Sequence, residues 1–178
     1  DPDNVLDYHI LSRNADEVSI AVVAVKNAQL EDTATFFDRV GKKLSAIDVS
    51  TFALSNAYCA TVLPEEREKS VVVFNIGEKK MDAVYLLNGN FHSYRTMTSG
   101  ALDSVISMLT KHLNSDAEKC HTIFESGDTS CVDGFSEAEV EEALKISYEE
   151  IVSAVEFGIR FFSTQDNAEN PEQEATKN

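Results

Sequence analysis

The sequence predicts an α/β protein in which mixed sheets pack against helices. Short apolar runs of a strand's length alternate with longer segments whose apolar residues recur at helical spacing. Hydrophobic residues make up 43% of the 178 residues, which is enough for a substantial core. The seven glycines and three prolines are few for a loop-rich or all-β scaffold. These observations favour strands covered by helices.

The first part of the chain, residues 1–63, is expected to form a small unit of ββαβα order. Its second strand is apolar on both faces toward its end, as expected of a buried inner strand. Its first helix carries apolar residues on one stripe. The elements are expected in order at residues 5–12, 17–25, 28–44, 45–49 and 50–62, and the stripe consists of Leu30, Ala34, Phe37 and Leu44.

A polar stretch at residues 64–69 separates this unit from the next and is expected to be a hinge. Residues 70–162 then predict a βββαα unit followed by a long helix. Asn88-Gly89 between two apolar runs indicates a tight hairpin, because both residues tolerate positive φ. The elements are expected at residues 70–75, 81–87, 91–97, 100–113, 116–125 and 136–162, with a loop at 128–134.

The two ends of the long helix differ in character. Ser136 and Glu139 have the spacing of a capping box, in which a hydroxyl and a carboxylate satisfy unpaired backbone N–H groups reciprocally. Residues 163–178 contain no core former, so a disordered tail is expected there.

Charge and composition exclude several classes of function. The net charge of −16 argues against non-specific nucleic-acid binding and against a basic face on anionic lipid. No apolar run approaches the roughly 20 residues that span a bilayer. The four histidines have no metal-ligand spacing, and the three cysteines suggest no disulfide framework, which favours a reducing cytosol. The acidic residues of 128–150 form either a solvated face or a docking face for a basic partner.

The segment Val71–Gly77, VVVFNIG, carries the most chemical information. An apolar strand that ends in a polar residue, then Ile-Gly, then a hairpin, is a recurring phosphate-loop arrangement. The glycine lets backbone N–H groups approach phosphate oxygens, and an acidic residue before it would position Mg²⁺ or water. A strand and a turn with no bound phosphate explain the same residues.

The whole chain resembles the PilM family of type IV pilus assembly proteins, which is related to FtsA and to the cytoplasmic domain of GspL. The resemblance implies an actin-like (ribonuclease H-like) two-lobed fold, here incomplete, with a first-lobe small subdomain at 1–63 and a second-lobe subdomain at 70–162. The matching segments are Val18–Val25, the Ile-Asp-Val of Gly41–Val49, Ser50–Ala60, Val71–Gly77, Asp82–Met97, Arg95–Gly100, Asp116–Lys119 and Phe135–Phe162.

The departures from the family pattern concern its nucleotide site. Asn75 stands where the pattern has an aspartate and Met81 where it has a threonine, while Gly77 and Asp82 match. An amide cannot hold a metal-bound water as a carboxylate does. The resemblance therefore implies a degenerate nucleotide site at Asn75, Gly77 and Asp82, with no catalytic residue and no cofactor. The alternative is an actin-like ATP-binding protein whose nucleotide loops lie partly outside this chain, with ATP and Mg²⁺ bound by the full-length parent.

The resemblance implies a cytoplasmic scaffold of a type IV pilus or related secretion machine. Such a protein would bind the short cytoplasmic tail of an inner-membrane partner similar to PilN, and would be peripheral to the membrane through that partner. The expected groove lies beside the first subdomain, at Val22, Ala24, Phe37 and Phe52. A homo-oligomer and an interaction module of an unrelated secretion complex remain open alternatives.

Overall fold

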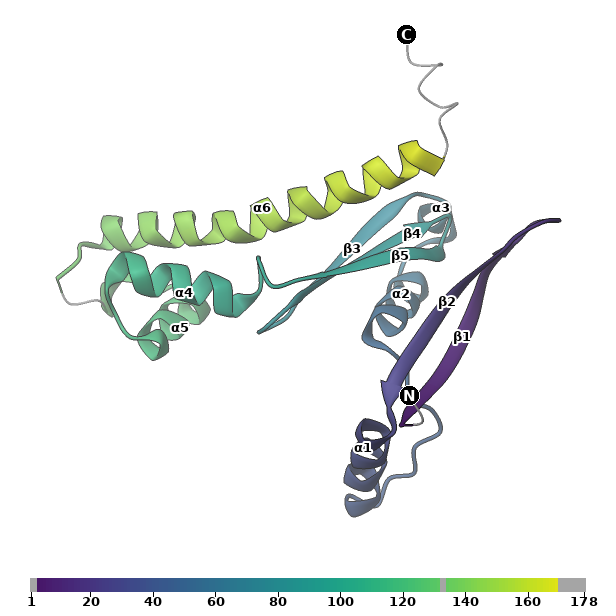
Figure 1. The fold of residues 1–178 in the computed structure, drawn as a ribbon. Helices are drawn as coiled ribbons and strands as arrows, with labels where there is room; N and C mark the ends of the chain where they lie inside the picture. The colour runs from purple at the N-terminus through teal and green to yellow at the C-terminus, as the bar shows by residue number, and fades with distance from the viewer. Residues whose placement is uncertain (1–2, 132–133, 170–178) are drawn as a thin grey trace, which may run out of the picture.

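The computed structural model describes residues 3–131 and 134–169. The chain begins with a two-stranded antiparallel hairpin and a helix, and a second helix leads to an antiparallel sheet of three strands in the order β3-β4-β5 (Figure 1). We call these the hairpin and the central sheet. Their elements are β1 (Asn4–Arg13), β2 (Val18–Lys26), α1 (Asn27–Arg39), α2 (Ser50–Thr61), α3 (Pro64–Arg67), β3 (Val71–Ile76), β4 (Met81–Leu87) and β5 (Asn90–Met97).

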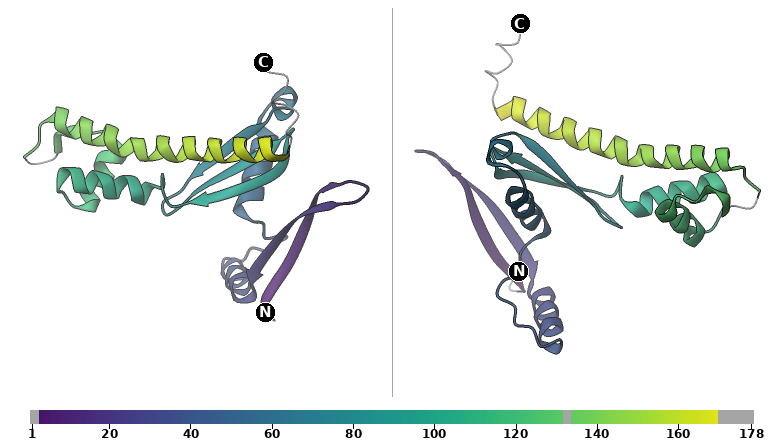
Figure 2. Two further views of the ribbon diagram at one scale, coloured as in Figure 1. Left: turned by 45° about the horizontal axis from the view of Figure 1, so that its top comes forward. Right: turned by 180° about the vertical axis from the view of Figure 1, so that it is seen from behind.

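The remaining elements are helical and follow β5 in the chain. A long helix runs over the central sheet and continues across two shorter helices (Figure 1). The hairpin stands on the side of the central sheet away from this long helix (Figure 2). The helical elements are α4 (Leu102–Leu113), α5 (Ala117–Ser126), the 3₁₀ turn η1 (Thr129–Cys131) and α6 (Glu137–Glu169).

The first half of the core lies between the central sheet and α6. Alternate residues of β4 face α6 and pack against Ala154 and Phe162. Phe162 stacks on Tyr85 with ring centroids 5.4 Å apart. The guanidinium of Arg95 lies over the rings of Phe157 and Phe161, 4.8 and 4.4 Å from their centroids. These contacts hold the C-terminal half of α6 on the sheet.

The second half of the core joins the three helices α4, α5 and α6. Their apolar stripes meet in one buried cluster: Ile106, Leu109, Leu113, Cys120, Ile123, Val140, Ala143 and Leu144. α6 therefore contributes to both halves of the core, which explains how one helix can join the sheet to the helical end.

The local turn and cap predictions are confirmed. Asn88 and Gly89 have φ values of 52° and 75° and connect β4 to β5 in the predicted hairpin. The backbone N–H of Ser136 donates to Glu139 Oε2 at 2.8 Å, and the backbone N–H of Glu139 faces Ser136 Oγ at 3.4 Å. This is the predicted capping box of α6.

Three predictions in the first unit are wrong. Residues 45–49 form no strand, and Ile47 and Val49 instead line a hollow beside the hairpin. α1 ends at Arg39 instead of residue 44, because Gly41 takes a left-handed φ of 68° that breaks the helix. β2 is not a buried inner strand. Among the described residues it pairs only with β1, and Val22 in its middle is 59% exposed.

The polar segments also differ from the prediction. The expected hinge contains the short helix α3, begun by Pro64 at a position where its missing N–H costs nothing. The expected disordered tail is instead helical from Ser163 to Glu169, as the last turns of α6. Ser163 Oγ donates to Ile159 O and Thr164 Oγ1 to Arg160 O. Residues 170–178 of that tail lie outside the described residues.

No described helix has both the length and the apolar composition needed to cross a bilayer.

Candidate functional site

Two neighbouring hollows lie between the hairpin on one side and α2 and the central sheet on the other. We call them the first and second hollow, and together the hairpin groove. Their volumes are about 590 and 560 Å³, which is within the range of small-ligand sites. The side chain of Phe52 on α2 lines both.

An aromatic contact joins the hairpin to the rest of the molecule at this point. The ring of Phe52 meets the ring of Phe91 edge to face, with centroids 4.7 Å apart. It also lies 6.4 Å from the ring of His9 on β1. Phe52 therefore both divides the groove and attaches the hairpin to the central sheet.

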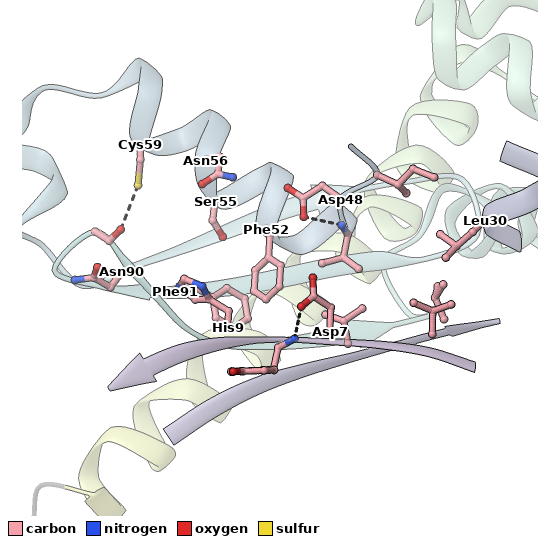
Figure 3. A pocket seen from close by; sticks show the side chains of 17 residues that line it. Asp7, His9, Leu30, Asp48, Phe52, Ser55, Asn56, Cys59, Asn90 and Phe91 are labelled. Atoms are coloured by element: carbon pink, nitrogen blue, oxygen red, sulfur yellow. Dashed lines mark hydrogen bonds between the residues drawn. The ribbon is translucent and has the colours of Figure 1, made fainter. Parts of the chain in front are cut away.

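The first hollow is lined by β1, α2 and the turn that begins β5 (Figure 3). Asp7 and Asp48 give it a negative side. Each carboxylate accepts a hydrogen bond from the backbone N–H of the next residue, at 2.8 Å. At the far end Cys59 Sγ lies 3.3 Å from Gly89 O, which ties α2 to the hairpin turn of the central sheet.

The second hollow runs along strand edges. It is lined by consecutive residues of β2, Ile20–Ala24, and of β5, Phe91–Tyr94. Because consecutive side chains of a strand point to opposite faces, a hollow that contacts all of them follows the edge of the strand. Each of these strands has a ladder partner on one side only among the described residues. Both edges can therefore offer backbone N–H and C=O groups to an added segment.

Asp82 forms part of the floor of the second hollow. It is 2% exposed, and its Oδ1 accepts a hydrogen bond from Thr96 Oγ1 at 2.6 Å. Its Oδ2 lies 3.1 Å from the ammonium of Lys80 but has no aligned hydrogen bond.

The structure does not gather the predicted nucleotide residues into a phosphate cradle. Asn75 pairs with Asp82 across β3 and β4, but its side chain is exposed. The N–H of Gly77 donates to Lys80 O at 2.9 Å, which closes the turn on itself. The carbonyls of Gly77 and Glu78 accept the N–H groups of Leu102 and Asp103 at 3.0 and 2.9 Å. The turn thus occupies donors at the start of α4 that an anion would otherwise use.

The predicted partner-binding residues divide into two groups. Val22, Ala24 and Phe52 line the second hollow. Phe37 does not lie in the groove; it is half-buried on α1, with its ring 5.4 Å from that of Phe36. Sequence reasoning missed His9 and Phe91, whose roles depend on contact between strands far apart in the chain. The aromatic residue two positions after Gly89 was the available signal for Phe91.

The described residues hold no cluster of side chains suited to bind a metal ion. Within residues 3–131 and 134–169, no three His, Cys, Asp or Glu side chains gather to hold a metal ion. Two carboxyls with lowered pKa values lie outside the groove. Hydrogen bonds from the Ser130 side chain and backbone lower the pKa of Asp128, and those from the Ser136 backbone and side chain lower the pKa of Glu139.

Comparisons with known proteins place the fold and the family. No curated protein matches the sequence significantly. A solved structure described as a PilM–PilN type IV pilus biogenesis complex is similar, with a TM-score of 0.69 and 16% identity over 92% of this chain and 47% of that one. The chain thus spans about half the length of that relative, and the predicted actin-like α/β class is confirmed. The family model for the type IV pilus assembly protein PilM matches residues 3–173. The chain therefore belongs to the PilM family of type IV pilus assembly proteins.

Proposed function

We propose that the chain is a cytoplasmic scaffold of a type IV pilus machine that binds the short cytoplasmic tail of a PilN-like inner-membrane protein in the hairpin groove. Binding would link the inner-membrane platform to the assembly motor. Membership of the PilM family supports the machine, and the similar structure contains PilM together with PilN.

The observation that carries the proposal is the make-up of the second hollow. It combines strand edges of β2 and β5 with the apolar side chains of Val22, Phe52 and Phe91. An extended peptide gains affinity from main-chain hydrogen bonds at such an edge and specificity from pockets for alternate side chains. A hollow of about 560 Å³ has room for a few residues of an extended segment, but not for a folded domain.

The charge of the chain favours a peptide with lysine or arginine. A net charge of −16 attracts cations over a long range, and Asp7 and Asp48 add a local negative side to the first hollow. Salt should weaken this attraction only in part, because apolar anchors buried in the groove are not screened.

The proposal does not require a nucleotide. Asn75 lacks the charge that the family pattern places there, and the Gly77 N–H is already bonded within its turn. We therefore propose a scaffold rather than an ATPase.

The experiment is a nuclear magnetic resonance titration of ¹⁵N-labelled protein. The ligands are N-terminal cytoplasmic peptides of inner-membrane pilus proteins encoded beside the gene. We expect shift changes at Ile20–Ala24 and Phe91–Tyr94. Changes confined to the acidic residues 128–150, with the groove silent, would place the docking surface on α6 and overturn the proposal.

A matched pair of variants separates the groove from general surface effects. Val22→Asp puts a charge on β2 in the groove, at a residue that is 59% exposed. Val152→Asp makes the same change on α6, at a residue that is 56% exposed and outside both hollows. Only Val22→Asp should abolish binding. Circular dichroism and thermal melting of both variants check that the fold is retained.

A further inference from the structure

Asp82 is a charge buried at an unusual place. A buried carboxylate is costly unless it is paired and hydrogen-bonded, and Asp82 is 2% exposed. It lies on β4, the middle strand of the central sheet, on the face toward the second hollow, whereas its neighbours Met81 and Ala83 face α6. Apolar residues would satisfy the packing at this position without that cost.

The two oxygens of this carboxylate are not equally satisfied. Oδ1 has a short hydrogen bond from Thr96 Oγ1, at 2.6 Å, which fixes the orientation of the carboxylate. Oδ2 is buried and has no hydrogen-bond partner of good geometry. Its neutralising neighbour is the Lys80 ammonium, which lies 3.1 Å from Oδ2 and donates a long hydrogen bond of 3.5 Å to Oδ1. The Lys80 side chain is 55% exposed.

Lys80 is a replaceable counter-ion. Its ammonium is strongly hydrated and sits on a flexible four-carbon stem, so water can solvate it when it leaves Asp82. Because Asp82 itself is buried, its carboxylate then needs another cation in the same place. A cationic group of a bound ligand can therefore replace the Lys80 ammonium beside the Asp82 carboxylate.

The surroundings of Asp82 suit a long cationic side chain. Phe52, Phe91 and Tyr94 line the same hollow and offer aromatic surface to an aliphatic stem or a planar guanidinium. The edge of β5, which carries Thr96 opposite Asp82, can hold the backbone of an added strand. A side chain from such a strand would reach the carboxylate from the open side of the hollow.

We propose that Asp82 binds a cationic side chain, arginine in preference to lysine, of the peptide that occupies the second hollow, and that Lys80 moves into solvent when it does so. This rests on the proposed function and specifies the chemistry of its partner. Arginine is favoured because its weakly hydrated fork can bond to Oδ2 while Thr96 keeps Oδ1.

The first test is a double-mutant cycle with the peptide found in the titration above. Replacing its arginine by citrulline keeps the shape and removes the charge, and Asp82→Asn does the same on the protein. Each change should weaken binding about 10-fold to 100-fold, and the two together should cost no more than either alone. Independent, additive losses, or no loss, would overturn the inference and leave peptide binding in the groove intact.

Lys80 provides a second test with a matched control. Lys80→Met removes the competing ammonium and should strengthen binding of the arginine peptide several-fold. Lys79→Met removes the same charge from the same turn without removing the contact to Asp82, so its effect should be smaller. Equal effects of the two variants would show that only net charge matters. This comparison remains informative if Asp82→Asn fails to fold.

A third probe does not depend on the peptide. N-acetyl-arginine amide, titrated into labelled wild-type protein, should shift the Thr96 amide and the Asp82 carboxyl resonance in a saturable manner. Its citrulline analogue should not. If no peptide binds the groove but the arginine probe does, the proposed function fails while the cation site stands. If the arginine probe gives no saturable shift at Thr96 or Asp82, the cation site is refuted.

Discussion

Replacing Phe52 with alanine should loosen the attachment of the hairpin more than it destabilises the whole fold. The ring makes an edge-to-face contact with Phe91 at 4.7 Å and a weaker one with His9 at 6.4 Å. Aromatic pairs contribute about 0.5–1.5 kcal/mol each. A fully buried phenylalanine costs about 3–5 kcal/mol when it is truncated, and Phe52 is half-buried. We therefore expect a loss of about 2 kcal/mol.

Hydrogen exchange of backbone amides measures where this loss falls. A two-stranded hairpin is marginally stable on its own, so β1 and β2 should open once they leave α2 and β5. A loss of about 2 kcal/mol raises the population of that open state roughly 30-fold. Amides in β1 and β2 should exchange faster by this factor, whereas amides in β4 and α6 should change much less. Peptide affinity should also fall.

Phe37→Ala is the matched control. It makes the same truncation at another half-buried phenylalanine, on α1 and outside the groove. Exchange in β1 and β2 and peptide affinity should stay close to wild type. If Phe52→Ala changed hairpin protection by less than about 0.5 kcal/mol, or no more than Phe37→Ala does, Phe52 would not be the attachment point.

The remaining predictions concern nucleotide, pH and packing. The chain should not bind MgATP, and Asn75→Asp should not create hydrolysis; micromolar affinity by calorimetry would contradict this. Hydrogen bonds from Ser136 lower the pKa of Glu139 below its ordinary 4.5 in the folded state. The stability that ionised Glu139 contributes is therefore present above pH 4.5 and is lost as the pH falls through the folded pKa. Urea midpoints from about pH 6 to 3 should therefore fall less in Glu139→Gln than in wild type. Gly100→Ala should cost about 2 kcal/mol by urea unfolding, because φ is +75° and a Cβ would lie 2.6 Å from Ala154 Cβ; wild-type stability would refute that close approach.

Patterns within a few residues were sufficient to predict most elements of this chain. The Asn88-Gly89 turn and the Ser136–Glu139 cap are chosen by φ and by hydrogen bonds between near neighbours, so they form as predicted. The strands of the central sheet and the helices α4, α5 and α6 form where apolar residues recur at strand or helix spacing. The ordered motifs that resemble PilM also predicted the fold class that the similar structure shows.

Only the tertiary structure decided which apolar faces are covered and which polar groups are buried. Residues 45–49 alternate like a strand but pair with no other described strand, and β2 is apolar but pairs with β1 alone among the described residues. Asp82 has the local pattern of a solvated hairpin residue, yet it is buried on a strand against which α2, distant in sequence, packs. The groove residues Phe52 and His9 meet for the same reason. A periodic pattern states which face of an element is apolar, but whether that face meets protein or water depends on segments many residues away.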